Sequence, residues 1–174
     1  MRLLGLFPLL GLLFGGCAGY HVGPVKPTPM KSVHKIAVST FKNETLEPRL
    51  EVLMANALIK QIQQDGTYRI TSEQDADAIL QGTLERIERG AARGARNDFF
   101  QTSEYNLGVV ARIRATDKHT GRVLMERSAI GNSSFFVSGR NLRTADVNKD
   151  ERQAIPLAAE DLATQMVSYL SEGW

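Results

Sequence analysis

The stretch that most constrains the fold runs from residue 34 to residue 70, where three local patterns follow one another. It opens with a short apolar run, Ile36–Phe41, which is rich in β-branched residues and too short for a helix. After a polar turn, apolar residues recur at helical spacing as far as Gly66, which is expected to cap the helix in a left-handed conformation. Thr67–Ile70 is extended again. Strand, helix and strand in this order predict two parallel strands of one sheet, joined by a right-handed crossover.

The predicted helix is apolar over more of its circumference than packing on one sheet requires. The residues expected to face the sheet are Leu50, Leu53, Met54, Ala57, Leu58 and Ile62. Val52, Ala55 and Ile59 are also apolar and fall outside that set. A helix that is apolar on several sides is covered on more than one side. We prefer a second helix of the same chain as the cover, and the alternative is a partner protein.

The first 33 residues predict export and a lipid anchor. Residues 1–16 combine one basic residue with a short apolar run, which matches the core of a secretory signal and is too short to span a bilayer. Small residues lead directly to Cys17, the only cysteine of the chain, so an internal disulfide is excluded. This arrangement resembles the lipobox of bacterial lipoproteins, in which the cysteine is acylated and begins the mature chain. The alternative is an ordinary signal peptide with an incidental cysteine.

Residues 17–33 are expected to form an extended tether, because glycine and proline recur throughout them. Ala18, rather than an aspartate, follows the cysteine, which in other lipoproteins indicates sorting to the outer membrane. Acyl chains such as palmitate contribute about 0.8 kcal/mol per buried methylene group, so several chains anchor a protein stably. We therefore expect a domain on the periplasmic side of the cell outer membrane, held there by acylated Cys17.

Residues 34–174 have the length and the patterns of one domain. Ala76–Arg89 reads as a long strand, with Ile79 and Ile87 on the face opposite to Ala78, Leu80, Gly82 and Leu84. Gly82 within this strand indicates a bulge or the close approach of an overlying helix.

Two more strands and a helix complete the predicted domain. Gly90–Thr102 is expected to be a connection, after which Glu104–Asp117 alternates between apolar and polar residues. A tight turn leads to a partner strand, Arg122–Ile130. The C-terminal helix has an alanine-rich apolar face, and Pro156 is placed in or near its first turn. The predicted fold is therefore α+β: a two-layer sandwich with two helices packed on one face of a four- to five-stranded mixed sheet.

Catalysis has little support in the sequence. Hydrolase, metalloprotease and phosphate-loop motifs are absent from it, and His21, His34 and His119 lack the spacing of metal ligands. We therefore expect a protein that is not an enzyme and that holds no metal and no cofactor. The formal net charge of +2 points to no particular class of partner, and nucleic acid is not expected among them.

Binding through arginine side chains is better supported. Arg112 and Arg114 are assigned to the non-core face of their strand, and Arg86 and Arg89 lie near the end of the preceding one. Guanidinium groups suit phosphate geometry, so a basic and partly apolar sheet face suits an anionic amphiphile or a protein surface. The alternative is a solvated face whose arginines are partly paired with glutamates, Glu85 and Glu88.

Several segments together resemble the LptE family of lipopolysaccharide-assembly lipoproteins. They are the lipobox followed by Gly-Tyr-His, then IAVSTFKNETLEPRLEVLMANALIKQI, then ADAILQGTLERI, and last the alanine-rich helix that ends in Glu-Gly-Trp. Phe41–Ile62 is the most specific part. The resemblance implies an outer-membrane lipoprotein that sits inside and beside a large β-barrel of the LptD type. Such a protein helps the barrel to assemble and contributes to the delivery of lipopolysaccharide to the outer leaflet.

The resemblance gives the candidate surfaces a ligand and a partner. The candidate lipopolysaccharide-binding residues are Arg86, Arg89, Arg112 and Arg114. The candidate contacts of the barrel are Val52, Ala55, Ile59, Phe99 and Phe100. Because no family motif aligns with Gly90–Thr102, these assignments rest on physical chemistry alone.

Two alternative functions keep the lipid anchor and change the partner. The pattern I-A-V-x-x-F-x-N also resembles periplasmic lipoproteins that activate peptidoglycan synthases or build curli secretion pores. A purely structural envelope lipoprotein would have no stable partner. The segment from Glu47 to Ile62, together with ADAIL, fits the LptE family better.

Overall fold

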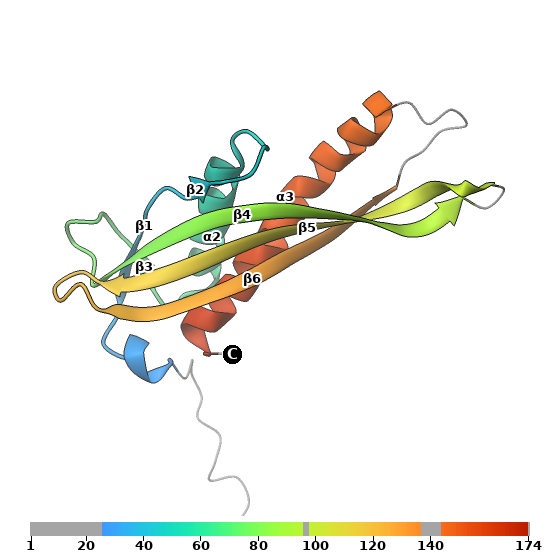
Figure 1. Cartoon of the computed structure of the whole chain (residues 1–174). Helices are drawn as coiled ribbons and strands as arrows, with labels where there is room; N and C mark the ends of the chain where they lie inside the picture. The colour runs from blue at the N-terminus through green and yellow to red at the C-terminus, as the bar shows by residue number, and fades with distance from the viewer. Residues whose placement is uncertain (1–25, 96–97, 137–143, 174) are drawn as a thin grey trace, which may run out of the picture.

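The computed structural model describes residues 26–95, 98–136 and 144–173. A short 3-10 helix, η2 (Thr28–Met30), is followed by β1 (Lys35–Val38), β2 (Lys42–Asn43), α2 (Leu50–Asp65) and β3 (Arg69–Ile70). Three long strands come next, β4 (Ala78–Ala95), β5 (Asp98–Asp117) and β6 (Val123–Phe136), and α3 (Thr144–Ser171) is the last element. Figure 1 shows α2 and α3 on the same face of the sheet. Within the described ranges, no helix is both long and apolar enough to cross a membrane.

The six-stranded sheet mixes parallel and antiparallel pairs. Its order is β3-β1-β4-β5-β6, and the two-residue strand β2 also pairs with β4. β1 runs parallel to both β3 and β4, whereas β4, β5 and β6 form an antiparallel meander. The crossover through α2 and the α+β sandwich with two helices on one face are therefore confirmed.

Both ends of α2 are residues in the left-handed conformation. Gly66 has φ 75°, and its N–H donates to the carbonyl of Ile62 at 3.1 Å, which confirms the predicted cap. At the other end, Arg49 has φ 66°, and this conformation costs a residue with a Cβ atom about 1–2 kcal/mol. Among the described residues, Arg49 is the only one other than glycine with a positive φ.

The core lies between the two helices and the sheet. The side chains that α2 buries completely are Leu50, Met54, Leu58 and Ile62. The alanine-rich face of α3 is also buried, and it packs so closely that a Cβ atom on Gly131 of β6 would lie 2.1 Å from the carbonyl oxygen of Ala158. Small residues on both sides therefore allow the helix and the strand to approach backbone to backbone.

The predicted connection Gly90–Thr102 is instead largely a β-hairpin. β4 continues to Ala95 and β5 begins at Asp98, with several register shifts in this part of the ladder. Ladder hydrogen bonds use the backbone and need no alternation of apolar side chains. The side-chain pattern therefore did not reveal this pairing.

Ile87 lies on the opposite face from the one predicted. A bulge between Leu84 and Arg86 shifts the register of β4 against β5 by one residue. Because side chains alternate along a strand, the extra residue turns Ile87 to the same side as its cross-strand partner Val109, which is fully buried. Ile87 accordingly packs against the core.

Two further backbone predictions are wrong. Pro156 lies inside α3, which starts well before it at Thr144. Proline has no N–H, so the carbonyl of Arg152 receives no helical hydrogen bond from Pro156. Both residues are exposed, and water can therefore donate to that carbonyl instead. Gly82 lies before the bulge, and the group that approaches it is the ring of Phe41 rather than a helix.

Candidate binding surfaces

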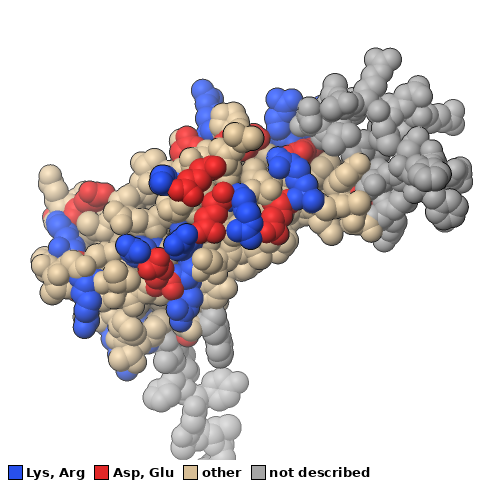
Figure 2. All heavy atoms as spheres, viewed as in Figure 1, with Lys and Arg blue, Asp and Glu red and all other residues tan. Residues whose placement is uncertain are grey.

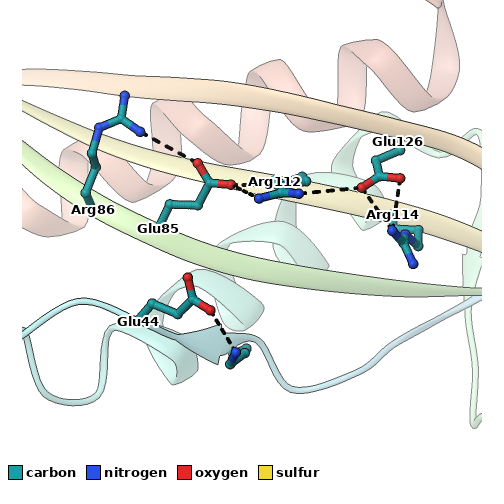
Figure 3. Close-up of polar contacts among 7 residues, drawn as sticks. Glu44, Glu85, Arg86, Arg112, Arg114 and Glu126 are labelled. Atoms are coloured by element: carbon teal, nitrogen blue, oxygen red, sulfur yellow. Dashed lines mark hydrogen bonds and ion pairs between the residues drawn. The ribbon is translucent and has the colours of Figure 1, made fainter.

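The sheet face away from the helices carries a row of alternating charges, which we call the charged ladder. Its members are Arg86, Glu85, Arg112, Glu126 and Arg114, and Figure 3 shows them in this order across β4, β5 and β6. The strand register explains the arrangement, because Arg114 lies directly opposite Glu126 on β6. Figure 2 accordingly shows basic and acidic side chains alternating over this part of the surface.

Each arginine of the charged ladder has a carboxylate partner. Arg112 donates from Nε to Oε1 of Glu85 at 2.9 Å, and Arg114 donates from Nη2 to both carboxylate oxygens of Glu126 at 3.1 Å. A longer contact of 3.9 Å between Arg112 and Glu126 joins the two pairs. Arg86 lies 3.7 Å from Glu85 and binds Glu88 at 2.7 Å.

These ion pairs are too exposed to stabilise the fold strongly. The hydrogen bond to Glu85 is the main reason why the pKa of Arg112 is raised above its ordinary value. The side chain of Arg112 is nevertheless 51% exposed, and water screens such a pair so strongly that it contributes little to stability. The charged ladder therefore has the pairing expected of a solvated face, while its guanidinium groups stay accessible to a competing anion.

Arg89 does not belong to the charged ladder. Its cross-strand partner is Leu107, a core residue, so the bulge in β4 has turned Arg89 to the helix side of the sheet. There its Nε donates to Oε1 of Glu151 on α3 at 2.7 Å. The structure therefore divides the four predicted arginines into a group of three on one face and Arg89 on the other.

The helix α3 lies beside α2, which confirms the preferred neighbour, a second helix of the same chain. Lys60 of α2 and Glu160 of α3 form an ion pair at 3.1 Å, and this flank of α2 lines a hollow with α3. Val52 remains 52% exposed and Ile59 is partly exposed, whereas Ala55 packs against the core. The preferred cover, a second helix of the same chain, is therefore present as α3, but it leaves Val52 largely exposed and Ile59 partly exposed.

Three other predicted residues lie where the structure describes no side chain. Phe99 and Phe100 fall within β5, but their side chains are outside the described residues. Cys17 also lies outside the described residues.

A second candidate surface was not apparent from the sequence. It is an apolar groove of about 620 Å³ between α2 and α3, which we call the α2–α3 groove. Its apolar lining consists of Pro48, Leu50, Val52, Leu53, Ile155 and Pro156, and its polar lining consists of Glu47, Arg49, Asn56 and Arg152. The only sequence signal was the excess apolar surface of α2 at Val52. Val52 comes together with Ile155 and Pro156 of α3 only through the packing of the two helices, which the sequence pattern does not reveal.

Comparison with known proteins shows similarity at the level of a family and of a fold. A family model described as LptE, lipopolysaccharide-assembly, matches residues 33–170. The chain is similar to PelC from Paraburkholderia phytofirmans, crystallised as a dodecamer, with 18% identity, a TM-score of 0.52, and 87% of this chain and 96% of that one covered. It is also similar to a Xanthomonas campestris protein of family DUF330, with 12% identity, a TM-score of 0.54, and 87% and 91% covered. At such identities these two structures show the fold alone. Comparison with curated proteins finds no match.

Proposed function

Because the chain belongs to the LptE family of lipopolysaccharide-assembly proteins, we propose that it is an accessory lipoprotein of the machinery that delivers lipopolysaccharide to the outer membrane. The observation that carries this proposal is the family match, which spans residues 33–170. It favours lipopolysaccharide assembly over the regulation of a peptidoglycan synthase or of curli secretion. In this role the protein acts by binding and catalyses no reaction.

The proposed anchor is acylated Cys17, and the proposed partner is an outer-membrane β-barrel of the LptD type. One contact supports a defined attachment of the tether to the domain. Lys26 donates from Nζ to the carbonyl of Val33 at 2.7 Å and lies 4.6 Å from the centre of the Tyr68 ring. Lys26, the residue nearest to Cys17 whose position the structure describes, is therefore held against the domain.

The proposed lipopolysaccharide contact on the sheet is the charged ladder. Phosphate groups would compete with Glu85 and Glu126 for the guanidinium groups of Arg112 and Arg114, whose pairs are half exposed. Arg89 is less suited to this role because it is engaged with Glu151 on the helix side. Among the proposed contacts of the barrel, Val52 is well exposed. Phe99 and Phe100 remain proposed contacts because they are large and apolar.

Co-purification from the native envelope tests the partner. The full chain, tagged at its C-terminus and extracted from outer membranes in mild detergent, is expected to bring down a β-barrel protein and lipopolysaccharide. A peptidoglycan synthase in the eluate would favour the first alternative instead. Recovery of the chain as a free monomer, without barrel or lipopolysaccharide, would contradict the proposal.

Metabolic labelling with an alkyne analogue of palmitate tests the anchor separately. The wild-type chain is expected to carry the label and to fractionate with the outer membrane. Cys17→Ala should lose the label and leave the outer membrane. Retention of the label in that variant would place the acyl chain elsewhere and refute the lipobox prediction.

A further inference from the structure

The α2–α3 groove has the size and the lining of a site for a small apolar ligand. Its volume of about 620 Å³ lies within the range of roughly 300–1,000 Å³ that is typical of such sites. Most of its lining is apolar. Val52, Leu53 and Pro156 are the apolar members that solvent reaches, whereas Leu50 and Ile155 are buried beneath them. Val52 at its margin is 52% exposed, so a ligand in the groove would remove this side chain from water.

The charges that line the groove are unequal in number. Arg49 and Arg152 contribute two guanidinium groups, whereas Glu47 contributes one carboxylate. Arg49 is exposed, and among the described residues it has no ion-pair partner. It is also the residue held at φ 66°, so the chain tolerates a strained backbone at this margin of the groove. Arg49 therefore suits the negative charge of a ligand whose apolar body lies in the groove.

The backbone around the groove favours an acyl chain over a peptide segment. Most lining residues within α2 and α3 have their N–H and C=O groups occupied by helical hydrogen bonds. The carbonyl of Arg152 is an exception, because Pro156 has no N–H to donate to it, and Pro48 likewise has no N–H to offer. An extended peptide laid in the groove would find few partners for its own backbone, and unpaired backbone groups are costly to bury. An acyl chain carries no such groups.

We propose that the α2–α3 groove binds one acyl chain of an anionic lipid, with the chain along Val52, Leu53 and Pro156 and the negative head group at Arg49. The site lies on the helix side of the molecule, whereas the charged ladder lies on the opposite face of the sheet. The inference does not depend on the barrel partner, so its failure would leave the co-purification experiment unaffected.

Fluorescence titration with cis-parinaric acid, and with its uncharged methyl ester, tests the proposal. The protein is the full mature chain with Cys17→Ser, so that an acyl chain of its own cannot occupy the groove. We expect saturable binding of one acid molecule per chain, and binding of the ester that is weaker on the order of tenfold, because only the acid offers a charge-assisted contact.

Arg49→Gly is the variant that tests the head-group contact. Glycine adopts positive φ without strain, so this change removes the guanidinium group while it favours the local backbone. The affinity for the acid should fall to that for the ester. Arg69→Gln, at an exposed position of the edge strand β3 outside both candidate surfaces, removes the same charge elsewhere and should leave both affinities unchanged. Equal binding of acid and ester by the wild-type chain, or an unchanged preference in Arg49→Gly, would overturn the proposal.

Leu53→Trp tests the location of the chain by filling the groove. It should abolish the binding of both probes while the protein still unfolds cooperatively. If this variant does not fold, Val52→Trp replaces it, because Val52 lines the groove and a larger side chain there does not enter the core. Undiminished binding by a folded variant would place the lipid elsewhere and refute the site.

Discussion

The aromatic ring of Phe41 lies directly over Gly82 of β4, so that a Cβ atom at position 82 would come within 2.0 Å of Cε1 of the ring. Phe41 is only 3% exposed, and the short strand β2 begins immediately after it. The absence of a side chain at Gly82 therefore decides where this buried ring sits. It also fixes how the chain passes from β1 toward α2.

Gly82→Ala should destabilise the protein by about 1–3 kcal/mol, because the new methyl group forces the Phe41 ring out of its buried place. The free energy of unfolding in urea measures the effect. Gly90→Ala in the same strand is the matched control, since a Cβ atom there meets nothing within 4 Å. Equal stabilities of the two variants would show that the ring relocates without cost.

Leu58→Asp should abolish cooperative unfolding, because Leu58 is completely buried and an unpaired charge there costs several kcal/mol. Val52→Asp places the same charge on the same helix at a residue that is 52% exposed, and it should keep a cooperative melt. Circular dichroism during heating distinguishes the two. A cooperative transition near the wild-type temperature in Leu58→Asp would refute the placement of this side chain in the core.

Asp77 should make stability depend on pH. Its Oδ2 accepts hydrogen bonds from the backbone N–H groups of His34 at 2.8 Å and Lys35 at 2.9 Å, and these bonds, that from His34 foremost, hold the pKa of Asp77 below its ordinary value. Because the folded pKa lies below the unfolded one, the contribution to stability is complete above about pH 4 and is lost as the pH falls through the folded pKa.

Asp77→Asn should therefore unfold more easily than the wild type at pH 7, by about 1 kcal/mol. The difference should shrink as the pH falls below 4, because the wild-type carboxylate then becomes protonated. Urea unfolding of both proteins at pH 7 and pH 3 measures it. A difference that is the same at both pH values would show that the charge of Asp77 contributes nothing.

Arg112→Gln combined with Arg114→Gln should weaken the binding of lipopolysaccharide, because Glu85 and Glu126 would then leave the charged ladder acidic. The loss should be larger at low salt, since ions screen exposed charges. Lys60→Glu changes the net charge by the same amount and lies on the helix side, in the pair with Glu160, so it serves as the control. Unchanged affinity in the double variant would leave the arginines as a solvated face.

The parts of the fold that were predicted correctly are those in which side-chain periodicity follows the structure directly. Leu107, Val109, Ala111, Ile113 and Ala115 alternate along β5, and the structure buries all of them. The helical spacing of Leu50, Leu58 and Ile62 marked the buried face of α2 in the same way. In both cases the core covers one face of the element. The apolar residues therefore recur every two residues along the strand and every 3.6 residues along the helix.

The predictions that failed depend on the backbone or on distant contacts. The bulge after Leu84 places Ile87 and Arg89 on the helix side of the sheet. The residue types around Glu85 do not indicate that the ladder contains an extra residue there. The start of α3 at Thr144 was missed because Pro156 suggested a first turn, whereas an exposed helix position tolerates proline.

The sequence alone determined the crossover through α2, the antiparallel meander, the two-layer arrangement and the resemblance to the LptE family. These follow because each rests on a local period or on a motif that is written in consecutive residues. Only the tertiary structure decided which arginines meet, which flank of α2 lies against α3, and that Leu53 and Ile155 line one groove. Those relations are set by register, helix packing and the bulge in β4, which bring together residues that are far apart along the chain.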